Sequence, residues 1–350
     1  MKTKNIMIAL TLLTTGTAWA EDFPKDSLKV VDIEEVVVIA TPKENRKLRE
    51  LPVATTLLSQ KDMQANQVHS VKNLTGIVPN LFIPDYGSKL TTSIYIRGIG
   101  SRINTPSVGL YVDNIPYIDK SAFDFNYADI ERIDILRGPQ GTLYGRNTMG
   151  GLIKVHTKSP FTYQGTDIRM GAATYNDYNV SLTHYHRISD RFAFSTGGFY
   201  EHTGGFFENA VRNNEKIDKS NAGGGRFRGI YLPTPNLKVD MTLSYEYSDQ
   251  GGYPYKYTGV TEGEETRPEY IGKIANNERS SYRRGLLNSG VNIEYQTRTF
   301  ILNAVTGYQN LNDRMFLDQD FTEKDIYTLE QKQRANTISE EIVFLSLIHI

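Results

Sequence analysis

The segment LKVDMTLSYEYS, residues 237–248, constrains the fold of this chain more than any other part of its sequence. Its apolar and aromatic side chains fall on odd positions from Leu237 to Tyr247, and its polar side chains fall on even positions from Lys238 to Ser248. A period of two held over twelve residues predicts a β-strand with one apolar and one polar face. The length also suits a tilted strand that crosses a lipid bilayer, which needs about 9–11 residues.

Weaker runs of the same kind lie on both sides of this segment: TDIRMGAATY, YNVSLTHYH, RFAFSTGGFY, GGGRFRGIYL, NSGVNIEYQ and TFILNAVTGY. Short links, such as ISD from Ile188 and PTPN from Pro233, alternate with long polar ones, such as the segment from Asp249 to Arg284. Tight turns at one end and long loops at the other are typical of an outer-membrane β-barrel. A secreted β-sandwich explains the strands but not the unequal links, and strands of soluble proteins usually have only about 3–10 residues.

The number of strands is too small for a barrel that holds another domain. About seven or eight strands fit between Gly165 and the end of the chain, and the last run is EEIVFLSLIHI. An open sheet leaves unpaired backbone groups that hydrocarbon does not solvate, so a membrane sheet has to close. A barrel of about eight strands is filled by its own side chains. We therefore expect the front part of a longer barrel, and we expect residues 345–350, which lose the alternation, not to be barrel sequence.

The N-terminus indicates export. Residues 1–20 combine Lys2 and Lys4, a short apolar core and the small-residue site Ala18-Trp19-Ala20, which is the pattern of a secretory signal peptide. The chain contains no Cys, so the sequence offers neither a lipid-attachment cysteine nor a disulfide. Its net charge of −1 provides no basic field for nucleic acid. No apolar stretch is long enough to predict a membrane-spanning helix.

Residues 48–160 predict a compact α+β domain, which follows an N-terminal segment over 21–47 and precedes the barrel strands of 161–350. SQKDMQANQV begins with Ser59, a good N-cap, and spaces its apolar residues as a helix does. A second short helix is expected in SVKNLTGIV. The strand-like pieces TSIYIRG, SVGLYVD, RIDILRG and GLIKVHTKSP follow, with a tight turn at Asp113-Asn114.

The sequence contains no convincing catalytic or metal-binding set. The glycines of RGPQGTLYGRN do not form a phosphate-binding loop, because only three residues separate Gly141 from Gly145 and no Lys follows. His184 and His186 lie two apart on a strand and so share a face, but neither a nearby carboxylate nor a third His accompanies them. We therefore expect no enzymatic activity, no metal site and no covalently bound cofactor.

Three motifs in order resemble the plug domain of TonB-dependent outer-membrane receptors: IRGIG from Ile96, VGLYVDNIP from Val108 and IERIDILRGPQGTLYGRNTMGGLIKVHTKSP from Ile130. The resemblance implies a globular plug inside a barrel of about 22 strands. It also implies that Arg97 and Arg137 of the plug pair with barrel-wall glutamates, with Glu341 as the expected partner and Glu340 as the alternative. Lys154 and His156 depart from the usual family pattern, which leaves the local plug–wall contacts open.

The apolar run EEVVVIATP, residues 34–42, has no pairing partner nearby and resembles the TonB box of this family. The resemblance implies that TonB, part of an inner-membrane energising complex, binds this run by adding it to a sheet edge. The expected TonB-binding residues are Glu34, Glu35, Val36, Val37, Val38, Ile39 and Ala40. A plain apolar linker is the alternative.

The same resemblance implies active import of a scarce, bulky ligand, most often an Fe(III)–siderophore, across the outer membrane of a Gram-negative bacterium. Cobalamin, haem or a glycan are the alternative ligands, and a passive pore or surface adhesin is the alternative function. Plug loops that face outside supply the expected ligand-binding residues Tyr86, Arg102 and Asn104. We expect a monomer that contacts TonB, outer-membrane lipid and a small-molecule ligand but no nucleic acid.

Overall fold

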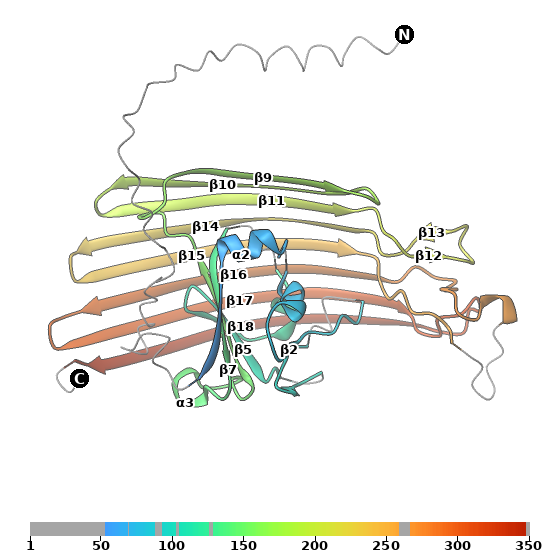
Figure 1. The fold of residues 1–350 in the computed structure, drawn as a ribbon, viewed down its shortest axis with the longest axis horizontal. Helices are drawn as coiled ribbons and strands as arrows, with labels where there is room; N and C mark the ends of the chain where they lie inside the picture. The colour runs from blue at the N-terminus through green and yellow to red at the C-terminus, as the bar shows by residue number, and fades with distance from the viewer. Residues whose placement is uncertain are drawn as a thin grey trace, which may run out of the picture. The chain divides into compact units, whose positions relative to one another are not determined.

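The computed structural model describes residues 53–68, 70–87, 93–102, 105–125, 129–258 and 267–347. The predicted signal peptide, residues 34–42 and Asn104 lie outside these ranges. The described residues belong to one compact unit, in which they build a small mixed domain and a large antiparallel sheet (Figure 1). No helix in the described ranges is long and apolar enough to span a membrane.

The small domain is built on a five-stranded sheet in the order β1-β7-β8-β5-β6. Its strands are β1 (Ala54–Ser59), β5 (Val108–Val112), β6 (Ile115–Tyr117), β7 (Ile130–Arg137) and β8 (Gly151–Thr157). β5 and β8 pair in parallel, and the other neighbours are antiparallel. The predicted strands in SVGLYVD, RIDILRG and GLIKVHTKSP are confirmed. Because these central strands are covered on both faces, they read as apolar runs and supply most of the domain's core.

Short helices connect the strands. α2 (Gln60–Ala65) begins after the predicted N-cap Ser59, whose hydroxyl accepts a hydrogen bond from the Asp62 N–H, while the Asp62 carboxylate accepts one from the Ser59 N–H. The second predicted helix is a 3₁₀-helix, η3 (Val71–Gly76). The domain is completed by η5 (Lys120–Ala122), α3 (Gly141–Tyr144) and a small sheet of β2 (Leu81–Phe82), β3 (Tyr95–Ile96) and β4 (Ile99–Gly100).

The turn between β5 and β6 lies where the sequence predicts it. Asp113 and Asn114 have φ values of 48° and 70°. Two successive positive φ values are the geometry of a type I′ hairpin turn, which Asp and Asn tolerate better than most residues. The turn brings the Asp113 carboxylate and the Ile115 side chain to the part of the domain that meets the large sheet.

The large sheet has eight antiparallel strands, each paired with the next one along the chain. They are β9 (Gly165–Ala173), β10 (Asp177–Ser189), β11 (Phe192–Thr203), β14 (Ser220–Thr234), β15 (Leu237–Gln250), β16 (Ser281–Gln296), β17 (Phe300–Asp318) and β18 (Thr328–Ser346). The predicted number of seven or eight strands is confirmed. β18 continues through Leu345 and Ser346, two residues beyond the point where the sequence predicts barrel strand to end.

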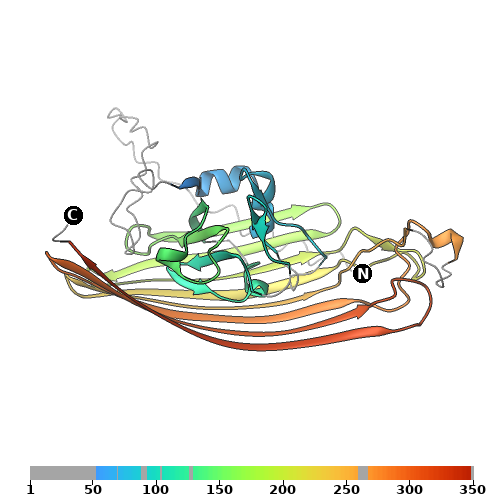
Figure 2. The same ribbon diagram turned by 90° about the horizontal axis from the view of Figure 1, so that it is seen from below.

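The strands curve around the small domain, which lies on the concave face of the sheet (Figure 2). The two faces of the sheet differ as the alternation predicts. In β15, Met241 and Tyr245 on the convex face are 38% and 51% exposed, whereas Asp240 and Glu246 on the concave face are 4% and 6% exposed. The polar face of the sheet therefore contacts the small domain, and the apolar face points away from it.

The connections between strands are unequal at the two ends of the sheet. At one end, residues 190–191, 235–236 and 297–299 form tight links, and we call this the short-connection end. At the other end the connections 204–219, 251–280 and 319–327 are longer, with 174–176 as a short exception, and we call this the long-connection end. The long connections carry β12 (Glu208–Asn209), β13 (Glu215–Lys216) and η6 (Pro268–Tyr270).

Candidate functional site

Two arginines of β14 clamp Asp113 of the β5–β6 turn. Arg226 Nη2 lies 2.5 Å from Asp113 Oδ2, and Arg228 Nη1 lies 3.4 Å from Asp113 Oδ1. Thr157, at the end of β8, donates its N–H and its hydroxyl to the same carboxylate. Arg228 is itself fixed by Asp240 of β15, to which its Nε and Nη2 donate at 3.0 and 2.8 Å. The clamp therefore joins the small domain to two strands of the large sheet.

Acid is expected to loosen this clamp. Burial alone raises the pKa of Asp113, but the charges of Arg228 and Arg226 and the hydrogen bonds from Thr157 outweigh it and hold the pKa well below its usual range. An unfolded Asp has a pKa of about 3.9, so the clamp stabilises the fold fully above about pH 4, and this stabilisation is lost as the pH falls further. Guanidinium unfolding midpoints should therefore drop as the pH is lowered below about 4.

The Asp113→Asn variant is the control for this acid effect, because its side chain has a similar shape and does not titrate. It should be less stable than wild type at neutral pH, and its unfolding midpoint should drop less on acidification. Equal pH dependence of the two proteins would contradict the assignment of the acid effect to Asp113.

A further arginine, Arg284 of β16, is fully buried between the sheet and the small domain. Its Nη1 donates to the Ser121 carbonyl oxygen at 2.5 Å, and its Nη2 donates to the Asp124 carbonyl oxygen at 2.6 Å. Nη2 also lies 2.5 Å from Glu246 Oε1 on β15, which balances the charge. A charge is tolerated in such a buried place only when it has an ionic partner and hydrogen bonds. Arg284 thus fixes the backbone around η5 against the sheet.

Apolar contacts seal another part of the same interface. Ile115 of β6 packs against two inward-facing glycines, Gly290 of β16 and Gly307 of β17, which we call the glycine notch. A Cβ on Gly290 would lie 2.1 Å from Ile115 Cδ1, and a Cβ on Gly307 would lie 3.1 Å from Ile115 Cγ2. Leu286 and Leu311 of the same two strands belong to the core cluster of the small domain. Ile115 therefore fits against β16 because Gly290 has no side chain.

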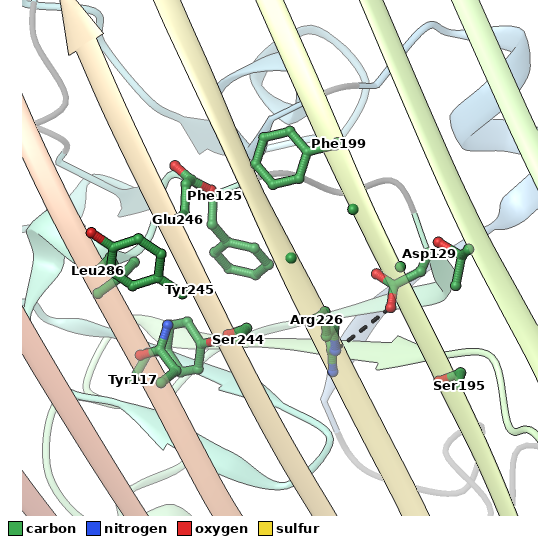
Figure 3. Close-up of a pocket in the computed structure, with 15 residues that line it drawn as sticks. Tyr117, Phe125, Asp129, Ser195, Phe199, Arg226, Ser244, Tyr245, Glu246 and Leu286 are labelled. Atoms are coloured by element: carbon green, nitrogen blue, oxygen red, sulfur yellow. Dashed lines mark ion pairs between the residues drawn. The ribbon is translucent and has the colours of Figure 1, made fainter.

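A small cavity lies in the interface, with Tyr117 and Phe125 of the small domain on one side and β11, β14 and β15 on the other (Figure 3). Arg226 and Asp129 both line it, and their Nε and Oδ2 atoms are 3.5 Å apart. The cavity volume is about 60 Å³. This space admits a few water molecules, whereas drug-sized ligands occupy pockets of roughly 300 Å³ or more. This cavity is therefore too small for a bulky molecule, whereas a larger one of about 490 Å³ lies between α2 and strands β9 and β10.

Of the two glutamates considered as anchors, only Glu341 faces the small domain. It accepts a hydrogen bond from Tyr111 Oη of β5 at 2.8 Å. Its neighbour Glu340 lies on the opposite face of β18 and accepts a hydrogen bond from Thr306 of β17 at 2.6 Å. Glu341 therefore contacts the small domain through a tyrosine hydroxyl.

The two arginines expected to anchor the small domain lie in other surroundings. Arg137 Nη1 donates to the Pro79 carbonyl oxygen at 3.1 Å, within the small domain itself. Arg97 is exposed, with a φ of 53°. Neither forms an ion pair with a carboxylate in the described ranges. The ion pairs of Asp113 instead run from arginines of the sheet to a carboxylate of the small domain, and the sequence did not predict them. Lys158, just after β8, pairs in the other direction with Asp167 of β9 at 2.6 Å.

At the long-connection end, the structure brings Tyr86 and Arg102 together. The Arg102 guanidinium carbon lies 4.7 Å from the centre of the Tyr86 ring, which is within cation–π range. Tyr255, from connection 251–280, donates its hydroxyl to the Tyr86 carbonyl oxygen at 2.5 Å. The Tyr255 ring lies 5.0 Å from that of Phe321, in connection 319–327. We call these four residues the outer cluster; it combines one cation with three aromatic rings from three segments.

The histidine pair of β10 lies on the convex face of the sheet. The rings of His184 and His186 stack with their centres 5.9 Å apart, and His184 Nδ1 lies 2.8 Å from Thr166 Oγ1. Among the residues that the structure describes, no three or more His, Cys, Asp or Glu side chains form a group that suits a metal ion.

Comparisons with known proteins identify relatives of the small domain. The family model for the TonB-dependent receptor plug domain matches residues 47–152. The chain is 30% identical over 149 residues to the pesticin receptor of Yersinia pestis, a match that covers 42% of this chain and 22% of the relative. It is 27% identical over 191 residues to the vitamin B12 transporter BtuB of Vibrio vulnificus, covering 51% of this chain and 28% of the relative. The matches thus span less than a third of the length of these curated relatives.

Solved structures share the fold of the small domain and the sheet together. The ferric yersiniabactin uptake receptor FyuA from Yersinia pestis matches with a TM-score of 0.72 at 21% identity, covering 84% of this chain and 46% of that one. The pyoverdine outer-membrane receptor FpvA from Pseudomonas aeruginosa, bound to pyoverdine, matches with a TM-score of 0.67 at 14% identity, covering 85% and 44%. At such identities the likeness concerns the fold alone.

A mixed domain held on the polar, concave face of an antiparallel sheet, with an apolar face turned outward, defines part of a plugged transmembrane β-barrel. Residues 47–152 match the plug domain of TonB-dependent receptors, and the strands that follow share the fold of the barrels of such receptors. Below, the small domain is called the plug and the large sheet the wall.

Proposed function

We propose that this chain is the plug and adjoining wall of an outer-membrane importer for a scarce, bulky ligand, and that the ligand is an Fe(III)–siderophore. The observation that carries the proposal is the outer cluster, where Arg102 stacks on Tyr86 beside Tyr255 and Phe321. A cation among aromatic rings suits an anionic chelate with planar groups. The matched structures of receptors named for ferric yersiniabactin and pyoverdine support the same class of ligand.

The proposal keeps the domain organisation expected from the sequence. Residues 1–20 are a signal peptide, 21–47 an N-terminal segment with the TonB box, 48–160 the plug and 161–350 strands of the barrel. A secretory signal followed by a barrel wall is consistent with the outer membrane of a Gram-negative bacterium. The long-connection end then faces outside, and the short-connection end faces the periplasm.

Two findings bear on the alternatives. A passive pore requires an open path, whereas the Asp113 ion pairs, the buried Arg284 and the glycine notch hold the plug against the wall. The match with a vitamin B12 transporter supports cobalamin as the alternative ligand. Binding assays with ferric yersiniabactin and cobalamin as probes distinguish these two ligand classes.

In this proposal TonB supplies the energy by pulling on residues 34–40, which lie outside the described ranges. Each main-chain hydrogen bond of an added strand contributes about 0.5–1.5 kcal/mol net. Ordering a loose segment offsets part of that gain. The contact is therefore weak and reversible, which suits a segment that TonB holds only during transport.

Uptake by cells that produce the full-length protein tests the proposal. Replacing Val36–Ile39 by a Gly-Ser linker is expected to abolish energised uptake of radiolabelled ferric yersiniabactin and to leave its binding to cells unchanged, because the outer cluster is intact. The matched control replaces Asp26–Lys29, four residues of the same segment, and should keep uptake. Uptake that survives the first replacement would contradict energised import and favour a passive pore.

A further inference from the structure

The outward face of the wall carries a row of cations across three neighbouring strands. Arg283 of β16 stands directly opposite Arg314 of β17, and Arg314 stands directly opposite Lys332 of β18. The side chains of these three residues, which we call the cationic row, are 50%, 49% and 66% exposed. The residues next to them, Arg284 and Asp313, are buried on the other face. Like charges directly opposite one another destabilise a sheet, so such a row calls for counter-charges.

Carboxylates of the wall balance the row only in part. Asp249 of β15 lies opposite the first cation, with an N–O distance of 3.1 Å. Glu330 of β18 contacts the second cation and lies 3.2 Å from Lys332 Nζ. Arg334, on the same face of β18 one step closer to the short-connection end, forms no ion pair with a carboxylate in the described ranges. Among the described residues of this part of the wall, four cations therefore face two carboxylates, which leaves a net positive charge.

The row lies where the strands leave the apolar band of the outward face. Tyr247 of β15 is one step from Asp249 on that face, and Tyr245 is the next outward residue of the same strand, so these two form an aromatic edge beside the row. Tyr295 and Phe344 form the corresponding edge near the short-connection end. Paired aromatic edges mark the two membrane–water interfaces of a transmembrane barrel. The cationic row therefore lies at the level of the lipid headgroups, on the side of the long connections.

We propose that the cationic row, together with Arg334, binds the phosphate groups of a bisphosphorylated glycolipid in the outer leaflet. The inference rests on the outer-membrane location in the proposed function. Guanidinium groups donate two parallel N–H bonds to a phosphate, and a lysine ammonium adds a compact charge. The row spans two inter-strand spacings, about 10 Å. That width suits a headgroup with more than one phosphate better than a single phosphodiester.

Binding of lipid A to the purified full-length protein in detergent tests the proposal. Wild-type protein should bind lipid A at least about tenfold more tightly than the same lipid with both phosphates removed, because cations near an anionic headgroup act additively. The double variant Arg314→Gln, Lys332→Gln should lose most of this preference. Arg298→Gln is the matched control, since Arg298 is an exposed cation in the 297–299 turn at the short-connection end, and this variant should keep the preference.

The comparison of the two lipids on wild-type protein needs no variant, so it decides the question even where the double variant folds poorly. Equal affinities for the two lipids, or a folded double variant that binds lipid A as tightly as wild type, would overturn the proposal. Displacement of bound lipid A by inorganic phosphate at equal concentration would assign the row to free phosphate and also overturn it. Because the lipid measurement involves neither TonB nor an imported ligand, its failure is distinct from failure of the uptake experiment.

Discussion

Replacing Arg284 by alanine is expected to lower the free energy of unfolding by about 3–5 kcal/mol, the usual cost of breaking a buried ion pair. The substitution removes the cation that balances Glu246 and the donor that the Ser121 and Asp124 carbonyl oxygens share. A buried carboxylate that loses its cation is strongly unfavourable, and so are acceptors that lose a buried donor. Guanidinium unfolding measures the loss, and limited proteolysis should cut first in the plug backbone around η5.

Arg283→Ala is the matched control, because it removes the same side chain from the neighbouring position on the outward face. Arg283 is half-exposed and pairs with Asp249 at the surface. Such pairs contribute about 0–1 kcal/mol, so the unfolding free energy should change little. The double variant Arg284→Met, Glu246→Leu should recover much of the loss, since replacing both buried charges by apolar groups is often neutral. Equal losses for Arg283→Ala and Arg284→Ala would refute the anchoring role of Arg284.

Local features of the sequence predicted much of the fold because each reports the surroundings of its own residues. Within β15, the alternation assigned Tyr245 to the outward face and Glu246 to the inward face, as the structure has them. The N-cap at Ser59 and the Asp113-Asn114 turn were predictable for the same reason, since both depend on backbone geometry within a few residues.

The outer parts of the long strands were harder to predict. β17 reaches Asp318 and β18 begins at Thr328, although the segments QNLNDRMFLD and TLEQKQRANTIS show little apolar alternation. Where an outward face meets headgroups and water instead of lipid tails, its residues need not be apolar, so the period-two signal fades. Strand pairing continues there because the backbone hydrogen bonds do not depend on the lipid.

Pairing across the plug–wall interface depends on which inward position of a strand meets which turn of the plug, and one sequence does not reveal that. The family resemblance directed attention to Arg97, Arg137 and Glu341, whose anchoring role stays a prediction. Among the described residues, the ion pairs of Asp113 instead involve arginines on inward positions of β14. A cation at an inward strand position is costly without a buried partner, so Arg226 and Arg228 were the sequence signal from which an acidic partner such as Asp113 could have been predicted.

The plug–wall interface combines two kinds of contact with different consequences. The ion pairs of Asp113 and Arg284 are directional and depend on charge, so acid or a single truncation weakens them. The contact of Ile115 with the glycine notch depends only on shape. A substitution that adds one methyl group to the notch therefore tests whether the Ile115 contact holds the plug against the wall, and it alters no charge.

Gly290→Ala is expected to displace the β5–β6 turn from the glycine notch and to lower the free energy of unfolding by about 1–3 kcal/mol, as overpacking does. The new Cβ would lie 2.1 Å from Ile115 Cδ1 and 2.7 Å from Ile115 Cγ1, so the side chain or the turn has to move. A moved turn also shifts Asp113 away from its arginines. Guanidinium unfolding measures the loss, and spin labels on introduced cysteines measure the displacement in a chain with no native Cys.

Ile115→Ala completes a double-mutant cycle with Gly290→Ala. Alone it should cost about 2–5 kcal/mol, because it leaves a cavity in the interface. The combined variant should be no less stable than Ile115→Ala, since the shortened side chain leaves room for the new methyl group. Gly285→Ala is the control, because Gly285 lies on the outward face of the same strand. The nearest atom to a Cβ there would be the Tyr245 hydroxyl oxygen, at 3.2 Å. If the losses of unfolding free energy in the two single variants added up in the combined variant, Ile115 would not occupy the notch. The ion pairs alone would then hold the plug against the wall.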